Sequence, residues 1–396
     1  MALGTQAVQV VSGVIAARLL GPTDRGYLAL LTVIPSSVCQ VGALGVSLSF
    51  CHFVASAPGS AWSLAQLLRR TALVQVTVLT LAHVVAVIAL VGGGEAGLVA
   101  AGAVTLVSVP ISFMSEYSLA GIQGVGRFQL VNVLRLMSPV AYAVLLLFPA
   151  VAGDASLLLV AALVVLANGV AAAVAAVYAR RLLTARNEPP QVSVGQMRAF
   201  AIRSYAGYFS PLEAFKLDQI LVGLVVSPAA LGYYVAGAAF ANLPRFFGST
   251  VGLIAAPAIS AERDPARQSS KLVLFTGATT ALTLAVALPL IGLVGYLLPL
   301  LFGEDFRAGV PVAQWLLVAS VFLAIRRVLA NSVRGFGVPL LSAPSEVLST
   351  AVFSVGIFLL GSDPELSSVG ALFAVSNGLG CALLAFRVAM LLRRRT

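Results

Sequence analysis

The chain has 396 residues, of which 60% are hydrophobic and only 10% are charged, and its mean hydropathy is +1.02. This composition excludes a soluble globular protein, which needs far more polar surface, and predicts a polytopic membrane protein. The formal net charge is +10, but no compact basic domain carries it. We therefore assign the excess arginine to cytoplasmic loops and expect no nucleic-acid partner.

Apolar runs of about 20 residues, the length that crosses about 30 Å of hydrocarbon, recur along the whole chain. We predict twelve transmembrane spans, at residues 2–20, 27–54, 72–91, 96–120, 128–150, 155–179, 200–226, 231–259, 272–298, 310–333, 340–360 and 366–391. The second and eighth runs exceed the minimum length. They should tilt, kink at Pro35 and Pro244, or extend past the bilayer.

The connections between these spans alternate in charge. One set is basic and holds Arg69, Arg70, Arg127, Arg180, Arg181, Arg186, Arg198, Arg263, Arg267, Lys271, Arg334, Arg393, Arg394 and Arg395. The other set is mostly acidic and holds Glu95, Asp154, Glu304, Asp305, Asp363 and Glu365 beside Arg25 and Arg307. The positive-inside rule then places both termini in the cytoplasm, in a multi-pass protein of the cytoplasmic (inner) membrane.

The sequence also repeats itself. Pro22, Gly26, Tyr27 and Gly42 recur as Pro228, Gly232, Tyr233 and Gly248, each 206 residues later. The ordered matches indicate a duplication, and six spans per half place the two halves parallel in the membrane. We predict an N-terminal six-helix bundle at residues 1–182, a cytoplasmic linker at 183–198 and a C-terminal six-helix bundle at 199–396.

Four charges interrupt the apolar hairpin of residues 203–260: Glu213, Lys216, Asp218 and Arg245. A charged side chain at mid-bilayer costs at least about 2.5–3.5 kcal/mol, so such residues mark a functional site by default. The hairpin is therefore the first candidate for half of a transport site.

Three segments carry a family resemblance. GVIAARLLGPTDRGYLALLTVIPSSVCQVGALGVSLSF, residues 13–50, resembles the opening of the polysaccharide-export and Wzx-type flippases, in which an "ARLLGP…G" turn joins the first two helices. LDQILVGLVVSPAALGYY, residues 217–234, is similar to the pattern of their seventh and eighth helices, and LFGEDFRAGVPVAQWL, residues 301–316, to the stretch that opens the tenth. This family belongs to the MOP superfamily, with the lipid II flippases and the MATE exporters.

The resemblance implies an all-α MATE-like fold, with two six-helix bundles around a central cavity lined mainly by helices 1, 2, 7 and 8. It also implies alternating access that moves an isoprenoid-pyrophosphate-linked sugar between leaflets. Lipid II flippases usually carry two further C-terminal helices, so twelve spans favour the Wzx-like branch. A pyrophosphate suits arginine, whose planar guanidinium offers paired donors.

Several residues are candidates for binding this substrate in the cavity: Arg18 at the "AR" position, Arg203, Arg245, Lys216, Gln40 and Asn242. The alternatives are snorkelling to the interface for Arg18 and Arg203, a structural ion pair for Arg245, and simple packing for the two amides. Glu213 and Asp218 are candidates for H⁺ or Na⁺ coupling, because a buried carboxylate can carry a proton. Alternatively Glu213 and Lys216, three residues apart on a helix, neutralise each other.

Four other intramembrane charges are interpreted as structural. Glu116 and Arg135 become Arg327 and Glu346 when shifted by 211 residues, so each half keeps one acid and one base. We expect an ion pair inside each bundle, Glu116 with Arg135 and Glu346 with Arg327 or its neighbour Arg326.

Enzyme signatures are missing from the sequence. It has no G-x-x-x-x-G-K-[ST] motif, and His52 and His83 are isolated, so we expect no enzyme activity, no metal and no cofactor. Our prediction is a flippase for a lipid-linked oligosaccharide. The alternatives are a MATE-like cation-coupled exporter, a membrane-embedded glycosyltransferase or polymerase, and a non-transporting partner of polysaccharide assembly enzymes.

Overall fold

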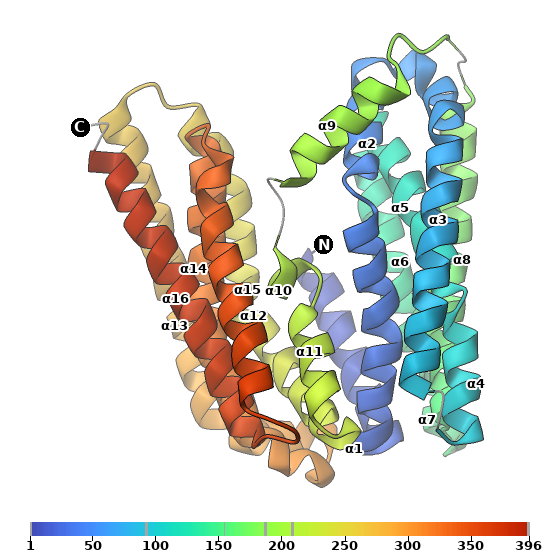
Figure 1. The fold of residues 1–396 in the computed structure, drawn as a ribbon, viewed down its shortest axis with the longest axis vertical. Coiled ribbons are helices and arrows are strands. Elements are labelled where there is room, and N and C mark those ends of the chain that lie inside the picture. The colour runs from blue at the N-terminus through green and yellow to red at the C-terminus, as the bar shows by residue number, and fades with distance from the viewer. Residues whose placement is uncertain (1, 92–93, 154, 186–187, 207–209, 394–396) are drawn as a thin grey trace. The chain divides into compact units, whose positions relative to one another are not determined.

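The computed structural model describes residues 2–91, 94–153, 155–185, 188–206 and 210–393, and all its regular elements in these ranges are helices (Figure 1). The helices are α1 Ala2–Gly42, α2 Val46–Ser56, α3 Ala61–Val91, α4 Ala96–Thr105, α5 Ser108–Gly124, α6 Phe128–Leu145, α7 Leu147–Ala152, α8 Leu157–Leu183, α9 Val194–Ala206, α10 Pro211–Ala214, α11 Leu217–Val225, α12 Pro228–Ser260, α13 Pro265–Phe302, α14 Val310–Gly335, α15 Ala343–Leu359 and α16 Leu366–Arg393. Short 3₁₀ turns lie at Pro58–Ser60, Glu304–Gly309 and Pro339–Ser342. Arg186, Arg394 and Arg395, three of the predicted loop arginines, and Asp154 lie outside the described residues.

Within the described ranges, eight helices are long and apolar enough to cross a membrane, or nine if α1 and the bent α2 count as one span. The prediction of an all-α polytopic membrane protein is confirmed. The number twelve stays a prediction, because several predicted spans correspond to shorter or broken helices.

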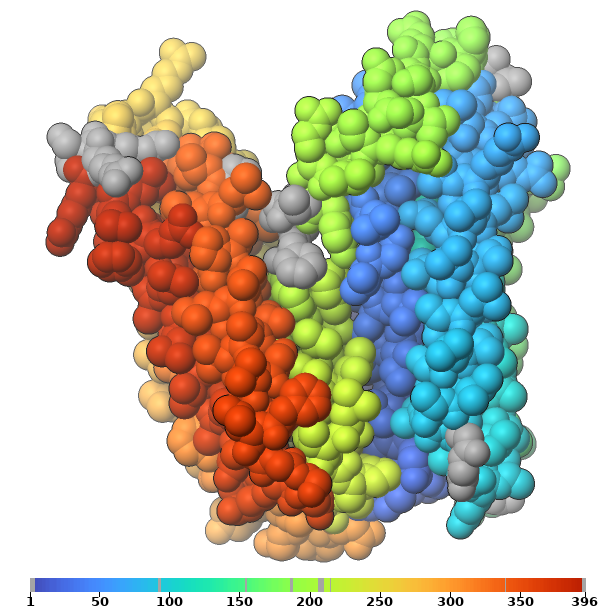
Figure 2. Space-filling model, in the orientation of Figure 1, coloured from blue at the N-terminus to red at the C-terminus, as the bar shows by residue number. Residues whose placement is uncertain are grey.

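The exposed face of helix α3 is apolar, as expected for a helix that contacts lipid. Leu73, Val74, Val78, Leu81 and Val85 are each more than half exposed along it, and Figure 2 shows α3, in light blue, on the outer surface. In water such a continuous apolar patch favours association or aggregation. In a bilayer it faces hydrocarbon, while the helix satisfies its own backbone hydrogen bonds.

By its contacts the chain divides into two compact units. The first is Met1–Leu20 with Tyr27–Tyr208, and the second is Gly21–Gly26 with Phe209–Thr396. The predicted boundary at 198/199 falls inside α9, which packs on α2 of the first unit, where the Ser49 hydroxyl donates to the Met197 carbonyl at 2.8 Å. The predicted seventh span, 200–226, is consequently not one helix: it covers the end of α9, then α10 and α11.

The second predicted span breaks at a different residue from the one expected. Leu44 and Gly45 have φ of 45° and 73°, and α2 departs from the direction of α1 by 55°. A Cβ at Gly45 would lie 2.5 Å from the Ala201 carbonyl oxygen on α9. The close approach of α9 and the left-handed backbone therefore both require glycine here, whereas Pro35 lies within helical α1.

Helix α1 is kinked at Gly21, whose backbone is non-helical with φ of 70°, and the segment Gly21–Gly26 that follows packs reciprocally against the start of α12. A Cβ at Gly26 would overlap the Pro228 carbonyl, and a Cβ at Gly232 would overlap the Pro22 carbonyl. Pro22 and Gly26 correspond to Pro228 and Gly232 under the 206-residue shift. Each of these two helix segments thus contacts the other with the same surface, as two-fold pseudosymmetry requires. This contact supports the duplication inferred from the sequence.

The core of the second unit is built on α12, α14 and α16. Glycines bring α12 close to α14: a Cβ at Gly237 would lie 3.0 Å from Ala313, and one at Gly248 would lie 2.5 Å from the Ala324 Cα. Small residues that let helix backbones approach are the usual basis of helix packing in membranes. This approach places the mid-helix arginines of α12 and α14 on neighbouring elements.

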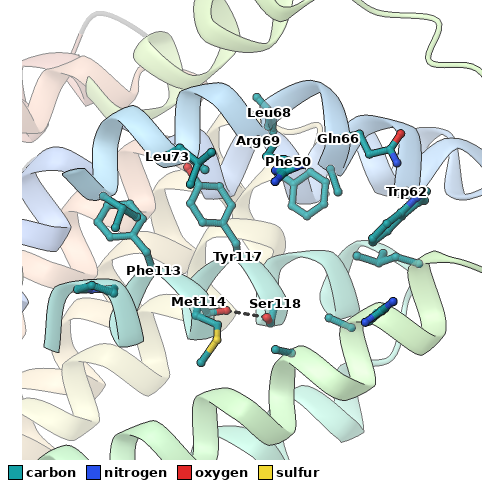
Figure 3. Close-up of a pocket in the computed structure, with 18 residues that line it drawn as sticks. Phe50, Trp62, Gln66, Leu68, Arg69, Leu73, Phe113, Met114, Tyr117 and Ser118 are labelled. Atoms are coloured by element: carbon teal, nitrogen blue, oxygen red, sulfur yellow. Dashed lines mark hydrogen bonds between the residues drawn. The ribbon is translucent and has the colours of Figure 1, made fainter. Parts of the chain in front are cut away.

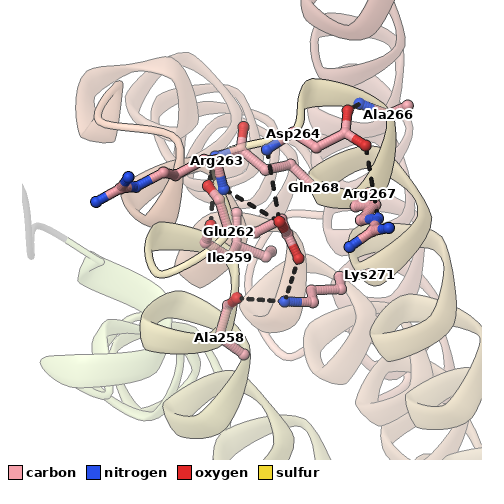
Figure 4. Close-up of polar contacts among 9 residues, drawn as sticks. All are labelled: Ala258, Ile259, Glu262, Arg263, Asp264, Ala266, Arg267, Gln268 and Lys271. Carbon is pink, nitrogen blue, oxygen red and sulfur yellow. Dashed lines mark hydrogen bonds and ion pairs between the residues drawn. The ribbon is translucent and has the colours of Figure 1, made fainter.

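A cluster of polar contacts fixes the turn between α12 and α13 (Figure 4). Lys271 donates to the carbonyl oxygen of Ala258 at 3.1 Å and pairs with Glu262 at 3.0 Å. Asp264 caps the start of α13 by accepting from the backbone N–H of Ala266 at 3.0 Å. These contacts satisfy backbone groups that both helix ends leave without intrahelical partners.

Candidate functional site

The candidate site begins at a break between two short helices of the second unit. Pro211 starts α10, and Lys216 adopts a left-handed backbone, with φ of 48°, before α11 begins. Glu213 and Lys216 therefore do not share one helix. The alternative interpretation, in which Lys216 neutralises Glu213, is corrected, because Glu213 pairs with two arginines. The Lys216 side chain is exposed.

Those two arginines come from different helices. Arg245 on α12 reaches the Glu213 carboxylate with an Nη2–Oε1 distance of 3.9 Å, and Arg327 on α14 makes a short contact with the same oxygen. The side chains are 15% exposed for Glu213, 21% for Arg245 and 42% for Arg327. One carboxylate thus holds two guanidinium groups at a position that remains partly open.

Behind this triad lies a second, buried pair. Arg326 on α14 is 1% exposed and lies 3.3 Å from the Glu346 carboxylate on α15. Arg326 also donates to the Ser349 hydroxyl, and the Ser210 hydroxyl donates to Glu346 at 2.8 Å. Gly380 on α16 leaves the room for this arrangement, because a Cβ there would overlap Ser349 and lie 3.0 Å from Arg326.

We call Arg245, Arg326, Arg327, Glu213 and Glu346 together the arginine cluster. Its three bases and two acids leave an excess of one positive charge. Arg326 is enclosed and already paired with Glu346, so only Arg245 and Arg327 could turn to a ligand. The predicted ion pair of Glu346 with Arg327 is wrong. Glu346 forms its ion pair with Arg326, the alternative that the sequence left open, and Arg327 forms one with Glu213.

Arg245 is oriented by its own helix. Its Nη1 donates to the Asn242 side-chain oxygen at 3.4 Å, and the Ser249 hydroxyl donates to its carbonyl oxygen at 3.3 Å. Asn242 thus contacts the guanidinium of Arg245 and helps to orient it, whereas Ser249 contacts only the Arg245 backbone carbonyl in this hydrogen bond.

Asp218 on α11 has a different environment. It is 7% exposed and accepts a hydrogen bond at 2.9 Å from the hydroxyl of Tyr234, which is fully buried on α12. This pair ties α11 to α12 on the chain segment that also carries Glu213. A movement of the α10–α11 segment would therefore displace both Glu213 and Asp218.

Arg18, Gln40 and Arg203 belong to the first unit. Arg18 and Gln40 have exposed side chains on α1, and the Gln40 carbonyl accepts a hydrogen bond from Tyr205 at 3.0 Å. Arg203 is exposed near the end of α9 and donates to the Ala199 carbonyl at 3.1 Å. Arg203 therefore lies on a helix packed against α2, outside the unit that holds the arginine cluster.

The predicted ion pair of the first unit is not formed. Glu116 on α5 accepts a hydrogen bond from the Ser47 hydroxyl at 2.5 Å, whereas Arg135 is exposed on α6. No ion pair joins them within 4.0 Å in the described parts of the chain. The physical reason is that Glu116 points toward α2, where a neutral donor satisfies it.

Sequence reasoning missed the contact of Arg327 with Glu213, which are 114 residues apart. The available signal was the adjacent pair Arg326-Arg327 in an apolar span, because two neighbouring bases need more than one acid as partner. Across the described ranges no three His, Cys, Asp or Glu side chains are grouped to hold a metal ion. His83 is fully buried, and neither ring nitrogen has a hydrogen-bond partner among those residues.

The fold is shared with solved transporter structures. Lipid II flippase MurJ in an inward closed conformation has a TM-score of 0.68 at 10% identity, covering 97% of this chain and 86% of MurJ. An inward-facing multidrug resistance MATE family transporter of the MOP superfamily has a TM-score of 0.72 at 13% identity, covering 98% and 95% of the two chains. A MOP superfamily transporter from Pyrococcus furiosus, described as having a binding pocket of reverse polarity, has a TM-score of 0.56 at 13% identity, covering 99% and 95%. At these identities the likeness shows the fold alone.

The chain is an all-α polytopic membrane protein whose fold is similar to that of solved MOP superfamily transporters. The model of the family described as polysaccharide biosynthesis protein matches residues 15–311, most of the chain, and the protein belongs to that family. No curated protein matches the chain in sequence.

Proposed function

We propose that the protein flips an isoprenoid-pyrophosphate-linked oligosaccharide, or a polysaccharide precursor, across the cytoplasmic membrane by alternating access. The observation that carries the proposal is the convergence of Arg245 and Arg327 on the single carboxylate of Glu213. Membership of the polysaccharide biosynthesis family, and a fold shared with a lipid II flippase, support the same substrate class.

The chemistry of the cluster suits a pyrophosphate. Two guanidinium groups provide several N–H donors in fixed planes, and phosphate oxygens accept such paired donors better than a point charge would allow. The cluster lies in apolar surroundings, where an anion gains more from two cations than it does in water. Glu213 occupies one part of this site in the described state, so the substrate would replace an internal anion.

This replacement suggests how binding and movement are coupled. A pyrophosphate on Arg245 and Arg327 would release Glu213 together with the short helix α10. Ser210 at the start of α10 is bonded to Glu346, and Asp218 on α11 is bonded to Tyr234. Displacement of this segment would expose Glu213 or Asp218 to protonation or to Na⁺, which makes them the coupling candidates.

The experiment is transport of a labelled polyprenyl-pyrophosphate sugar by protein reconstituted in vesicles. Arg245→Gln and Arg327→Gln should each weaken substrate binding by roughly tenfold or more, because a hydrogen bond to a charged group contributes about 1.5–3 kcal/mol. Arg307→Gln is the matched control, since Arg307 is an exposed loop arginine paired with Glu304. Unchanged transport in both cluster variants would contradict the assignment of the anion site.

The variant Glu213→Gln distinguishes two roles of Glu213: competition with the substrate anion for the arginines, and positioning of those arginines. If Glu213 competes with the substrate anion, the variant should bind substrate more tightly, with a lower KM, and turn over more slowly because its release is lost. If Glu213 only supports the arginines, KM should rise instead. Arg18→Gln, Gln40→Ala, Lys216→Gln, Asn242→Ala and Arg203→Gln extend the assay to the remaining predicted binding residues.

A MATE-like exporter of organic cations is the alternative within transport. The cluster carries one excess positive charge, which repels a cationic drug and attracts an anion. Export of a fluorescent cation by vesicles, with no effect of the labelled lipid-linked sugar, would favour the exporter. The same vesicles test orientation, because single cysteines in the arginine-rich loops should be labelled only from the side corresponding to the cytoplasm.

A further inference from the structure

The first unit contains a cavity of about 550 Å³ that the proposed transport site does not use. It lies among α3, α5 and α8, with Phe50 of α2 at its wall (Figure 3). Its volume falls within the range of roughly 300–1,000 Å³ typical of ligand pockets. Most of its lining is apolar, including Leu73 on α3 and Phe113 and Tyr117 on α5.

The lining changes along the cavity from polar to apolar. Trp62, Gln66 and Arg69 come from the first turns of α3, and Arg180 comes from the last turn of α8. Leu73 lies further along α3, on the same side (Figure 3). The lining from the first turns of α3 and the last turn of α8 therefore includes Arg69, Arg180 and Trp62, whereas the lining further along α3 and α5 is mostly apolar.

Arg69 and Arg180 have no carboxylate partner among the residues that the structure describes. Among the described residues, neither guanidinium makes a hydrogen bond or an ion pair, and both residues are exposed. This contrasts with Arg245, Arg326 and Arg327, each of which is paired with a carboxylate. An unneutralised pair of arginines beside an apolar cavity favours an anionic ligand.

The cavity lies beside an exposed apolar face of α3. Leu73 is 56% exposed at its rim, and Val74 and Val78 continue the apolar face of α3. Tryptophan and arginine at the arginine-rich end are the residues that mark a membrane–water boundary. A ligand here needs a chain in hydrocarbon and a negative group at the interface, and a free phosphate supplies only the second.

We propose that this cavity binds an anionic glycerophospholipid, with an acyl chain between α3, α5 and α8 and the phosphate against Arg69 and Arg180. Basic residues at the end of an apolar groove between membrane helices are suited to such headgroups. The site is distinct from the transport site, and the proposal stands whether or not the transported substrate is a lipid-linked sugar.

The chain offers a direct probe, because Trp62 lines the cavity and the sequence has only two tryptophans. In Trp315→Phe protein, Trp62 is the single emitter. Phosphatidylglycerol with brominated acyl chains should quench it at about 30-fold lower mole fraction than brominated phosphatidylcholine, the effect expected of two arginines near the surface. Equal quenching by the two lipids would show ordinary annular lipid and overturn the proposal.

Matched variants locate the effect. Arg69→Gln/Arg180→Gln should abolish the preference for phosphatidylglycerol, whereas Arg70→Gln/Arg181→Gln, which removes two neighbouring arginines that do not line the cavity, should preserve it. Equal loss in both double variants would indicate a general surface potential and overturn the assignment.

The apolar half of the site has its own test. Ala176→Leu should fill the cavity on α8 and reduce quenching by both brominated lipids, while Ala173→Leu, exposed on the same helix and outside the lining, should not. Thermal unfolding of each variant checks that it is folded. If millimolar inorganic phosphate relieves the quenching, the site binds anions in general, and the proposed lipid specificity is contradicted.

Discussion

In the second unit Glu346 meets Arg326 at 3.3 Å within a network of three arginines and two acids. In the first unit, at the repeat-related positions, Glu116 accepts one hydrogen bond from Ser47 and Arg135 is exposed. The scaffold is duplicated, but the buried charge is concentrated in one copy. The difference indicates that such a network is not a requirement of the fold, since these repeat-related positions of the first unit pack without an ion pair between them.

A buried ion network is by itself weak evidence for stability. Removing charges from water costs several kcal/mol for each ion, and good geometry only offsets that cost. Retention of three arginines in the second unit therefore favours a role beyond packing, as the proposed anion site requires. The two units make this inference testable, because each variant in one copy has a counterpart in the other.

The largest expected effect comes from Arg326→Met. It leaves Glu346 buried, with the Ser210 hydroxyl as its one remaining hydrogen-bond partner among the described residues. Removal of one member of a buried pair costs about 3–5 kcal/mol. Arg135→Met in the first unit should change stability by no more than about 0.5 kcal/mol, because Arg135 is exposed and unpaired in the described structure. Thermal unfolding in lipid nanodiscs measures both.

Arg326→Met/Glu346→Leu is the control for this comparison. Replacing both charges by apolar groups should recover much of the lost stability, because no unpaired charge then remains buried. If the double variant is as unstable as the single one, the packing of Arg326 rather than its charge supports the second unit.

The next effect separates the two copies of a repeated glycine. A Cβ at Gly248 would lie 2.5 Å from the Ala324 Cα, which is backbone and cannot move without separating α12 from α14. The three atoms nearest to a Cβ at its counterpart Gly42 all belong to the Leu79 side chain. We expect Gly248→Ala to destabilise the second unit by about 1–3 kcal/mol, and Gly42→Ala to cost less because Leu79 can rotate.

Gly277→Ala is a neutral reference for these variants, since a Cβ there meets nothing within 4 Å. Chemical denaturation monitored by circular dichroism gives all three values. A Gly42→Ala variant as unstable as Gly248→Ala would mean that the two copies pack equally tightly, and the contrast between the units would then rest on charge alone.

Much of the fold followed from the sequence. Composition gave the membrane class, the apolar runs located most helices, and the repeated Pro22 and Gly26 corresponded to a reciprocal contact with Pro228 and Gly232. These features could be predicted because hydrophobic length and glycine requirements are local. The breaks at Leu44–Gly45 and at Lys216 were missed. Neither position carries a proline, the run around Leu44 stays apolar, and the charges around Lys216 were interpreted as a site rather than as a helix break.

The site was only partly predictable for a related reason. Glu213 and Arg245 were identified because a charge in an apolar run is visible in sequence, but its partner is chosen in space. Local spacing offered Lys216 as the partner of Glu213, and the internal repeat offered Arg135 as the partner of Glu116. The structure supplies Arg327 and Ser47 instead. Helix breaks and side-chain direction decided both cases, and spacing alone contains neither.

The smallest expected effect concerns the turns outside the membrane. In the second unit the hydrogen bond from Lys271 holds the pKa of the Glu262 carboxyl below its ordinary value. A lowered folded-state pKa means that this contact stabilises the α12–α13 turn fully above the ordinary glutamate pKa of about 4.3, and that the stabilisation is lost as pH falls through the folded pKa. The α2–α3 turn of the first unit is held by neutral hydrogen bonds, such as Ser60 to the Ala57 carbonyl at 3.0 Å.

Hydrogen exchange between pH 6 and about pH 3, corrected for intrinsic rates, should therefore show the α12–α13 turn opening at acid pH while the α2–α3 turn does not. Glu262→Gln should remove this acid dependence and leave the turn slightly more open throughout. Glu304→Gln, which removes another exposed acid with an arginine partner, should leave the profile of the α12–α13 turn unchanged. If both turns open equally at acid pH, a group other than Glu262 causes the opening, and the two units do not differ in their pH dependence.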